Sequence, residues 1–377
     1  MLRRALILCC LGLLLAACTA GPRLLPGNRL DYNRNIQRSN EEELLLNIVR
    51  MRYYEPPFFL QVGSVSSNFG INAGVGAGGQ YYDRTSQVAR NSVNLSAQGS
   101  YSENPTITYT PVQGETHAKR LLAEIGVDRL ALFVRAGWHV DDVFRLMVER
   151  IASLENDFSA GGASRADEGQ RINSLKGFLE LCAFLRQKQI SRDLTVYEEH
   201  QNQDAAHVLE VRLADAAEAK RLGELLGRPL RLAPTPRGQV ARIRLATVNS
   251  FVSAAATDSA DNVVPIRMRS FLETMVGLAS GVQPSAEDVA QGAAVNLDNA
   301  DATALLQAYG LPPLIVVRRS AAQPQRAAVA AEHRGAWFYV DDTDTRSKAL
   351  MMLLGSLYAL QSGDVESMSP LLTIPVN

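Results

Sequence analysis

Two stretches of the chain place apolar residues at every second position, and this period constrains the fold more than any other feature. In residues 69–78 the odd positions are apolar and the even positions are glycine or asparagine. Residues 92–102 alternate in the same way between small or apolar residues and polar ones. A period of two is that of a β-strand, because successive side chains of a strand point to opposite faces. With the polar segment 81–91 between them, the two stretches predict a long β-hairpin with a flexible tip.

The glycines of the first stretch also have the spacing of a dinucleotide-binding loop. Gly74, Gly76 and Gly79 match that pattern. A phosphate loop, however, follows a buried strand and opens a helix, and an acidic residue lies about twenty positions further on. Here the glycines lie inside the strand pattern and no amphipathic helix begins after them. We therefore predict no nucleotide site in this segment.

The first residues have the plan of a bacterial export signal. Arg3 and Arg4 precede an apolar run that is too short to span a bilayer, since a spanning helix needs about 20 apolar residues. Residues 15–18, LAAC, resemble the lipobox of bacterial outer-membrane lipoproteins. The resemblance implies removal of residues 1–17, lipid on the sulfur of Cys18, and acylation of the new amino group. Thr19 in place of aspartate implies sorting to the outer membrane, with the body on the periplasmic face.

Cysteine use and charge limit the other possibilities. If Cys18 carries lipid, Cys182 is the only cysteine outside the signal segment, so no disulfide can form within the body. Cys182 lies in a segment with helical apolar spacing and is expected to be a small buried side chain. The formal net charge is −1, and no basic cluster suggests a nucleic-acid partner. After Cys18 no segment is apolar and long enough for a second membrane helix.

The order of expected elements gives an α+β fold in several parts. Residues 1–17 are the signal peptide and residues 18–38 a tether. Residues 39–158 form a helical domain that carries the hairpin at about 58–110, with a helix starting at Ser39 and a separate short strand in residues 103–111 fenced by prolines. A linker rich in glycine and small polar residues leads to residues 166–377, an α+β domain of mixed strands and helices. Its last segments are a hairpin bent at Gly335, a helix from Thr345 to Leu360 and a terminal strand.

Several acidic and histidine residues were weighed as catalytic or metal-binding groups. Asp341, Asp342 and Asp344 lack the glycine and glutamate of a calcium loop, and Asp344 is better placed to cap the following helix. Asp141 and Asp142 are adjacent on a helix and are expected to form a solvated face. The histidines show no zinc spacing, and no Gly-x-Ser-x-Gly elbow is present. We predict no catalytic, cofactor-binding or metal-binding residues and no cofactor, so Cys18 is the only predicted site.

These features predict a structural or accessory component of an envelope export or surface-assembly system, not an enzyme. Its expected partners are the membrane, through lipid on Cys18, and envelope proteins or further copies of itself. Two alternatives remain: an oligomeric outer-membrane pore built from the 69–102 hairpin, and a periplasmic enzyme or ligand-binding module. Residues 44–60 and 333–363 are similar to segments of uncharacterised proteobacterial lipoproteins, and that resemblance implies no known activity.

Overall fold

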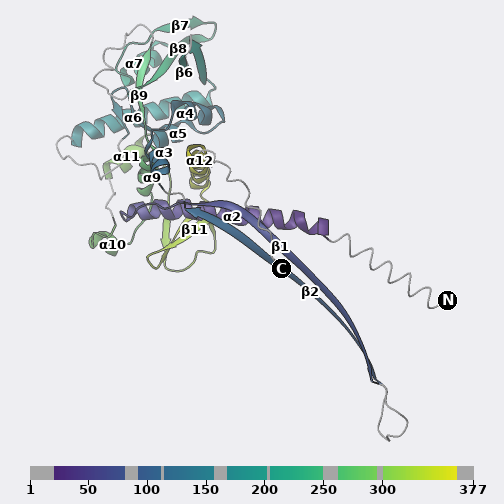
Figure 1. The fold of residues 1–377 in the computed structure, drawn as a ribbon. Helices are drawn as coiled ribbons and strands as arrows, with labels where there is room; N and C mark the ends of the chain where they lie inside the picture. The colour runs from purple at the N-terminus through teal and green to yellow at the C-terminus, as the bar shows by residue number, and fades with distance from the viewer. Residues whose placement is uncertain are drawn as a thin grey trace, which may run out of the picture. The chain divides into compact units, whose positions relative to one another are not determined.

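The computed structural model describes residues 21–80, 92–111, 114–156, 168–201, 204–248, 262–294 and 300–362 (Figure 1). Helices and strands are mixed along the chain, so the predicted α+β class is confirmed. Contacts divide the chain into two units. One is a hairpin unit, Phe58–Gln113; the other, called the body here, contains the described residues up to Pro57 and from Gly114 onward.

The hairpin unit consists of two long antiparallel strands, β1 (Leu60–Gln80) and β2 (Ser92–Pro111), which form a sheet of their own. Their register runs from Gln80 opposite Ser92 to Leu60 opposite Pro111, with one irregularity between Val62 and Ser64. The predicted hairpin is confirmed. The separate strand expected in residues 103–111 is instead the continuation of β2. Proline is tolerated there because both strands of a two-stranded sheet are edge strands, where a missing N–H need not break a ladder.

The larger sheet of the body has the strand order β4-β3-β9-β8-β6-β5, and β7 also pairs with β8. Its strands are β3 (Val148–Ile151), β4 (Leu154–Glu155), β5 (Leu194–Gln201), β6 (Asp204–Leu213), β7 (Leu232–Thr235), β8 (Gly238–Thr247) and β9 (Val263–Met268). Only the β8–β9 pairing is parallel among those of this sheet that the structure describes. Leu209, Val211 and Leu213 of β6 are buried at alternate positions, and Val208 on the other face is buried as well.

A smaller sheet lies near the end of the chain. Its strands β10 (Arg318–Ser320), β11 (Ala327–His333) and β12 (Ala336–Asp341) have the order β10-β12-β11. The bend between β11 and β12 is formed by Arg334 and Gly335, which have φ values of 51° and 73°. Two positive φ values are typical of the tight turns that suit the twist of a hairpin. The bend predicted at Gly335 is therefore confirmed.

The first described helix, α2 (Gly21–Arg52), includes residues well before the start predicted at Ser39 and covers the described part of the expected 18–38 tether. Its early part is held by side-chain pairs along the helix surface and not by an apolar face. Arg38 contacts Glu42 at 2.8 Å, and Gln37 donates to Glu41 at 3.0 Å. Such pairs three or four residues apart stabilise a helix without producing hydrophobic periodicity. The later turns bury Leu44, Leu45, Ile48 and Val49, and α2 contacts β11 and α9.

The remaining described helices belong to the body. They are α3 (Glu115–Leu122), α4 (Val127–Arg135), α5 (Val140–Met147), α6 (Glu168–Ile190), α7 (Ala216–Leu225), α9 (Phe271–Ala279), α10 (Ala286–Ala290), α11 (Ala300–Ala308) and α12 (Thr345–Ser362). Helix α5 ends at Met147 and the chain continues as β3. Helix α9 starts at Phe271, because Ser270 and Glu273 form a reciprocal capping box there.

Contacts within the body cross the linker predicted near residues 158–166. Strand β3, before the linker, pairs with β9, after it, and the N–H of Ile125 donates to the carbonyl of Arg269 at 2.9 Å. Helix α5 packs on α6, and α3 contacts both α9 and α12. The described residues on either side of the linker therefore share one core. The terminal strand expected after α12 lies outside the described residues.

Candidate functional site

The predicted lipid attachment site, Cys18, lies outside the described residues, as does the whole segment 1–20. Within the described residues no helix combines the length and the apolar character that a membrane span requires. Four features of the described residues are candidates for a functional role: a buried charge cluster, an acidic turn, a polar cluster at the end of α2, and the hairpin itself.

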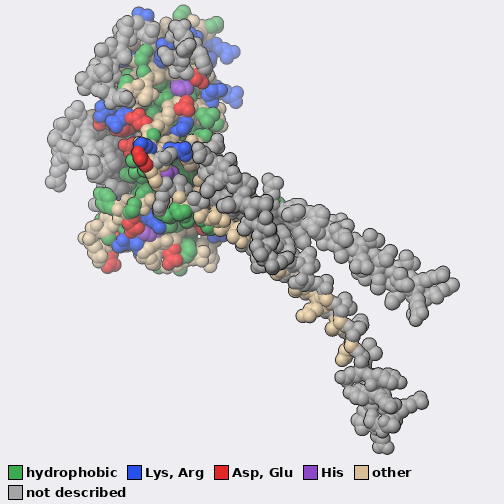
Figure 2. Space-filling view, in the orientation of Figure 1, with side chains coloured by type: hydrophobic (Ala, Val, Ile, Leu, Met, Phe, Trp, Pro, Cys, Tyr) green, Lys and Arg blue, Asp and Glu red, His purple; other side chains and the backbone are tan. Residues whose placement is uncertain are grey.

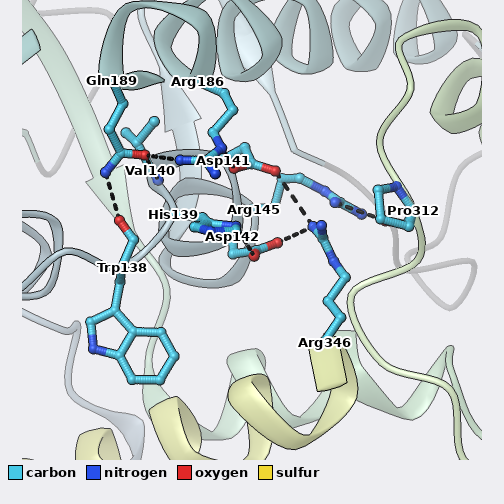
Figure 3. A network of polar contacts seen from close by, with 10 residues as sticks. All are labelled: Trp138, His139, Val140, Asp141, Asp142, Arg145, Arg186, Gln189, Pro312 and Arg346. Carbon is cyan, nitrogen blue, oxygen red and sulfur yellow. Dashed lines mark hydrogen bonds and ion pairs between the residues drawn. The ribbon is translucent and has the colours of Figure 1, made fainter. Parts of the chain in front are cut away.

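The buried charge cluster surrounds the first turn of α5 (Figure 3). Asp141 is 3 % exposed, and the carboxylate of Asp142 is also largely covered. Arg346, from the first turn of α12, contacts both carboxylates: its Nη2 is 3.4 Å from Oδ2 of Asp141 and also contacts Oδ1 of Asp142. Arg186 of α6 adds a second cation, with Nε 3.6 Å from Oδ1 of Asp141. Three helices therefore meet at two carboxylates.

Neutral hydrogen bonds complete this junction. The amide of Gln189, on α6, donates to the carbonyl of Trp138 at 2.7 Å and accepts from the N–H of Val140 at 3.0 Å, so it holds the start of α5 (Figure 3). Arg145, in the last turn of α5, donates through Nη1 to the carbonyl of Pro312 at 2.9 Å. The cluster thus fixes α5 against α6, α12 and the segment after α11.

Burial dominates the electrostatics of the cluster. It raises the pKa of Asp142 above its usual value, and the neighbouring charge of Asp141 raises it further, while Arg346, Arg145 and His139 act in the opposite direction. Burial also lowers the pKa of Arg145. The predicted solvated face at Asp141 and Asp142 is therefore wrong: both carboxylates are buried and both contact one guanidinium. No local pattern indicates this contact, since Arg346 lies 204 residues beyond Asp142.

His139, Asp141 and Asp142 could offer ligand atoms within 4.8 Å of one another, which raises the question of a metal site. The geometry of the cations argues against one. Arg346 contacts both carboxylates and Arg186 contacts one of them, so a metal ion would have to displace guanidinium groups that already neutralise the oxygens. The cluster is better explained as a charge-compensated junction between helices.

The acidic turn before α12 confirms the predicted capping role of Asp344. Its Oδ1 accepts from the N–H of Ser347 at 3.0 Å. Asp342 pairs with Lys348 at 2.7 Å. Asp341 accepts from the hydroxyl of Thr343 and from the N–H of the same residue at 2.9 Å, and these two hydrogen bonds lower the pKa of Asp341. Each carboxylate is thus engaged within its own turn. Cys182 is fully buried, and burial raises the pKa of its thiol, as expected for a packing residue.

A second polar cluster lies at the C-terminal end of α2. The hydroxyl of Tyr53 donates to Asp288 of α10 at 3.0 Å, and the guanidinium of Arg334 lies 5.1 Å from the centre of the Tyr53 ring. Nε2 of His333 is 3.3 Å from Oε2 of Glu55. Tyr53, Asp288, His333 and Arg334 border a cavity of about 360 Å³. The cluster fixes the end of α2 on the β11–β12 turn and on α10. His333 is therefore a largely buried member of this cluster.

The hairpin register confirms the alternation found in the sequence. Gly74 lies opposite Gln98, Gly76 opposite Ser96 and Gly78 opposite Asn94. All six of these residues are exposed. The intervening pairs join the other set, with Ala73 opposite Gly99, Val75 opposite Ala97 and Ala77 opposite Leu95. One face of the hairpin therefore carries glycine and small polar residues in both strands, and the residues that alternate with them are small or apolar.

The hairpin has open edges. Among the described residues β1 pairs only with β2, so no further strand covers the outer edge of either one. At about 3.3 Å per residue, strands of 21 and 20 residues extend for about 65 Å. In Figure 2 the described side chains of the hairpin that face the viewer include none of the colours of Lys, Arg, Asp or Glu, in contrast to the mixed charges of the body.

Comparison with known proteins adds no information to this geometry. No family model, no curated protein and no solved structure matches the chain. Arguments about function therefore start from the chain's own residues.

Proposed function

We propose that this protein is a lipoprotein anchored in the outer membrane through Cys18, acting as a structural or accessory component of an envelope export or surface-assembly system. The lipobox-like signal supports the anchor. The single observation that carries the assembly role is the two-stranded hairpin, which forms a unit of its own and, among the described parts of the chain, has no further strand at either edge.

A two-stranded hairpin of this length needs partner strands to be stable, for two physical reasons. Two strands without a third strand or a covering layer are marginally stable in water. Open edges of this length would also template unwanted pairing, and proteins ordinarily block or cover them. Residues 62–82 and 92–102 contain no charged residue that would discourage such pairing. Strands from further copies of the chain, or from another envelope protein, would pair these edges and supply the missing stability.

Deleting the hairpin should dissociate the complex that the protein forms in the envelope, while the body remains folded. Leu60 and Pro111 are register partners, so their ends are adjacent and a short Gly-Ser linker can replace residues 60–111. We expect the native complex, extracted in detergent and sized by mass spectrometry, to fall to the mass of a single chain. The body should keep its circular dichroism and its unfolding transition, because its core is shared among elements outside the hairpin.

The matched control replaces only residues 81–91 by a two-residue turn and leaves both strands in place. This shortened variant should retain the size of the parent complex. A complex of unchanged size after excision of residues 60–111 would contradict the assembly role of the hairpin.

The hairpin register favours a second candidate function, an oligomeric outer-membrane pore. Its two faces differ in the way that lipid and a water-filled lumen require, and each strand exceeds the 9–11 residues or so that a tilted spanning strand needs. Because open strand edges cannot exist in lipid, such a pore requires several copies to close a ring.

Cysteine labelling tests the pore. Gly74→Cys and Gly78→Cys should react with a charged thiol reagent, since each has open space around the new side chain. Ala73→Cys, Val75→Cys and Ala77→Cys should be protected by lipid. Cys182 is buried and gives a silent background. Equal labelling of the glycine-derived and the alanine- and valine-derived cysteines in intact membranes would contradict the pore proposal.

A further inference from the structure

The outer edges of the two hairpin strands match each other in length and in charge. Strands β1 and β2 have 21 and 20 residues and lie side by side (Figure 1). Among the described strands none lies beyond either of them. Residues 70–80 and 92–102, which pair with each other, contain no charged residue. A further strand can therefore approach either edge along this stretch without meeting a charge.

The pairing of β1 with β2 shows which strand suits each edge. Side chains of a strand stand above and below the sheet and not at its edges. A strand therefore presents the same side chains to a neighbour on its outer edge as to the neighbour on its inner edge. The side chains that let β2 lie beside β1 within one copy also let the β2 of another copy lie along the other edge of β1.

The glycines of β1 leave room for this second neighbour. Ser96 of β2 lies over Gly76: its hydroxyl donates to the carbonyl of Gly76 at 3.3 Å, and a Cβ added at Gly76 would lie 2.8 Å from its Oγ. A Cβ added at Gly74 or at Gly78 would have no neighbour within 4 Å. The polar side chains of β2 thus fill only part of the space over these glycines, and those of a second β2 can fill the rest.

Symmetry decides which edges of two copies can meet. If β1 paired with β1 of a second copy, one edge would be used twice and both β2 edges would stay uncovered. The two hairpins would also point in opposite directions or join unlike faces. Copies that the proposed lipid on Cys18 holds in one membrane share one orientation. Pairing of β1 with the β2 of the next copy keeps the direction and the faces and covers both edges.

We propose that copies of this chain join through their hairpins into a closed ring, in which the outer edge of β1 pairs antiparallel with the outer edge of β2 of the next copy. This inference rests on the proposed assembly role and names its partner, a second copy of the same chain. Within one hairpin the even-numbered residues of 64–80 lie opposite even-numbered residues of β2. The same holds between copies, because a shift of one residue would exchange the faces.

Disulfide crosslinking between two differently tagged copies of the full-length protein, in native membranes, tests this pairing. One copy carries Gly74→Cys, and the other carries one cysteine at an exposed even-numbered position of β2. These positions cover shifts of four residues in either direction from Gln98, the partner of Gly74 within one hairpin. Oxidation should join the two tags at one position, or at two neighbouring ones, about tenfold more than Gly74→Cys joins with itself, since directly opposite Cβ atoms are about 4.5–5.5 Å apart. Cys182 is buried and does not interfere. The β2 variants are Asn94→Cys, Ser96→Cys, Gln98→Cys, Ser100→Cys and Ser102→Cys.

Leu95→Cys is the matched control, because it lies between Asn94 and Ser96 in sequence and on the opposite face, so it should not crosslink with Gly74→Cys. Equal crosslinking with Leu95→Cys, or crosslinking of Gly74→Cys mainly with itself, would overturn the proposed pairing. So would the absence of crosslinks at every even-numbered position in a complex of native size, a result that leaves the assembly role intact with another protein as the partner. A parent protein that runs as a single chain would overturn both.

The mass of the native complex tests closure of the ring. A closed ring of copies has one discrete mass, whereas head-to-tail copies that do not close give an open series. We expect a single mass that corresponds to more than two copies. A ladder of masses, or a complex of two copies, would contradict the ring.

Discussion

Replacing Arg346 by methionine should lower the free energy of unfolding by about 3–5 kcal/mol, the usual cost of leaving a buried charge without its partner. Arg346 is the one residue whose guanidinium contacts both Asp141 and Asp142 in the described structure. Methionine keeps much of the side-chain volume and removes the charge. The decrease in the free energy of unfolding therefore measures the ion pairs more than the packing. Urea denaturation of the full-length protein, followed by circular dichroism, measures it.

A surface ion pair gives the matched control. Arg34 contacts Asp31 at 3.1 Å, and both side chains are mostly exposed. Arg34→Met should therefore change the free energy of unfolding by no more than about 1 kcal/mol. Similar losses in the two variants would show that the cluster at the start of α5 contributes no more than an ordinary surface pair.

The pH dependence of Arg346→Met gives a second measurement. Arg346 lowers the pKa of Asp142, so its removal should raise that pKa further. An acid whose pKa is higher in the folded than in the unfolded state destabilises the fold while it is ionised, and the penalty is relieved as the pH falls through the folded pKa. The difference in stability between parent and variant should therefore narrow from neutral to mildly acidic pH. A difference that stays constant or widens would contradict the charge-based explanation.

Replacing Cys18 by serine should release the protein from the membrane. Each buried methylene contributes about 0.8 kcal/mol, so one chain binds marginally whereas two or three chains hold a protein almost permanently. The variant loses the sulfur that would carry lipid. We expect the parent in the membrane pellet with an intact mass that includes acyl groups, and the variant in the soluble fraction without them.

Cys10→Ser is the control for this experiment, because it makes the same chemical change within the segment that the signal predicts to be removed. It should fractionate and be modified like the parent. If the Cys18→Ser protein remained acylated and in the pellet, the lipid-anchored component proposed here would have to be abandoned.

Local patterns in the sequence predicted the elements that depend on local chemistry. The alternation of residues 69–102 predicted the hairpin, since its two strands are close in sequence and their pairing follows from the period. Asp344 was recognised as a helix cap because the hydrogen bond spans only three residues. Ser270 and Glu273 also have the spacing of a capping box, and with that signal the start of α9 could have been predicted.

Features that depend on distant residues or on charge pairs were missed. The first half of α2 has no apolar stripe, and its stabilising pairs, such as Arg38 with Glu42, were interpreted as the polar character of a tether. Asp141 and Asp142 appeared solvated because Arg186 and Arg346 reach them from helices far along the chain.

The meeting of Leu60 with Pro111 at the base of the hairpin has an evolutionary consequence. The hairpin begins and ends at neighbouring points. It can therefore be lengthened, shortened or exchanged while the fold of the rest of the polypeptide is kept. Changes in steps of two residues on each strand would keep every remaining side chain on its own face. Natural variants of this chain should therefore differ in hairpin length by such even, matched steps.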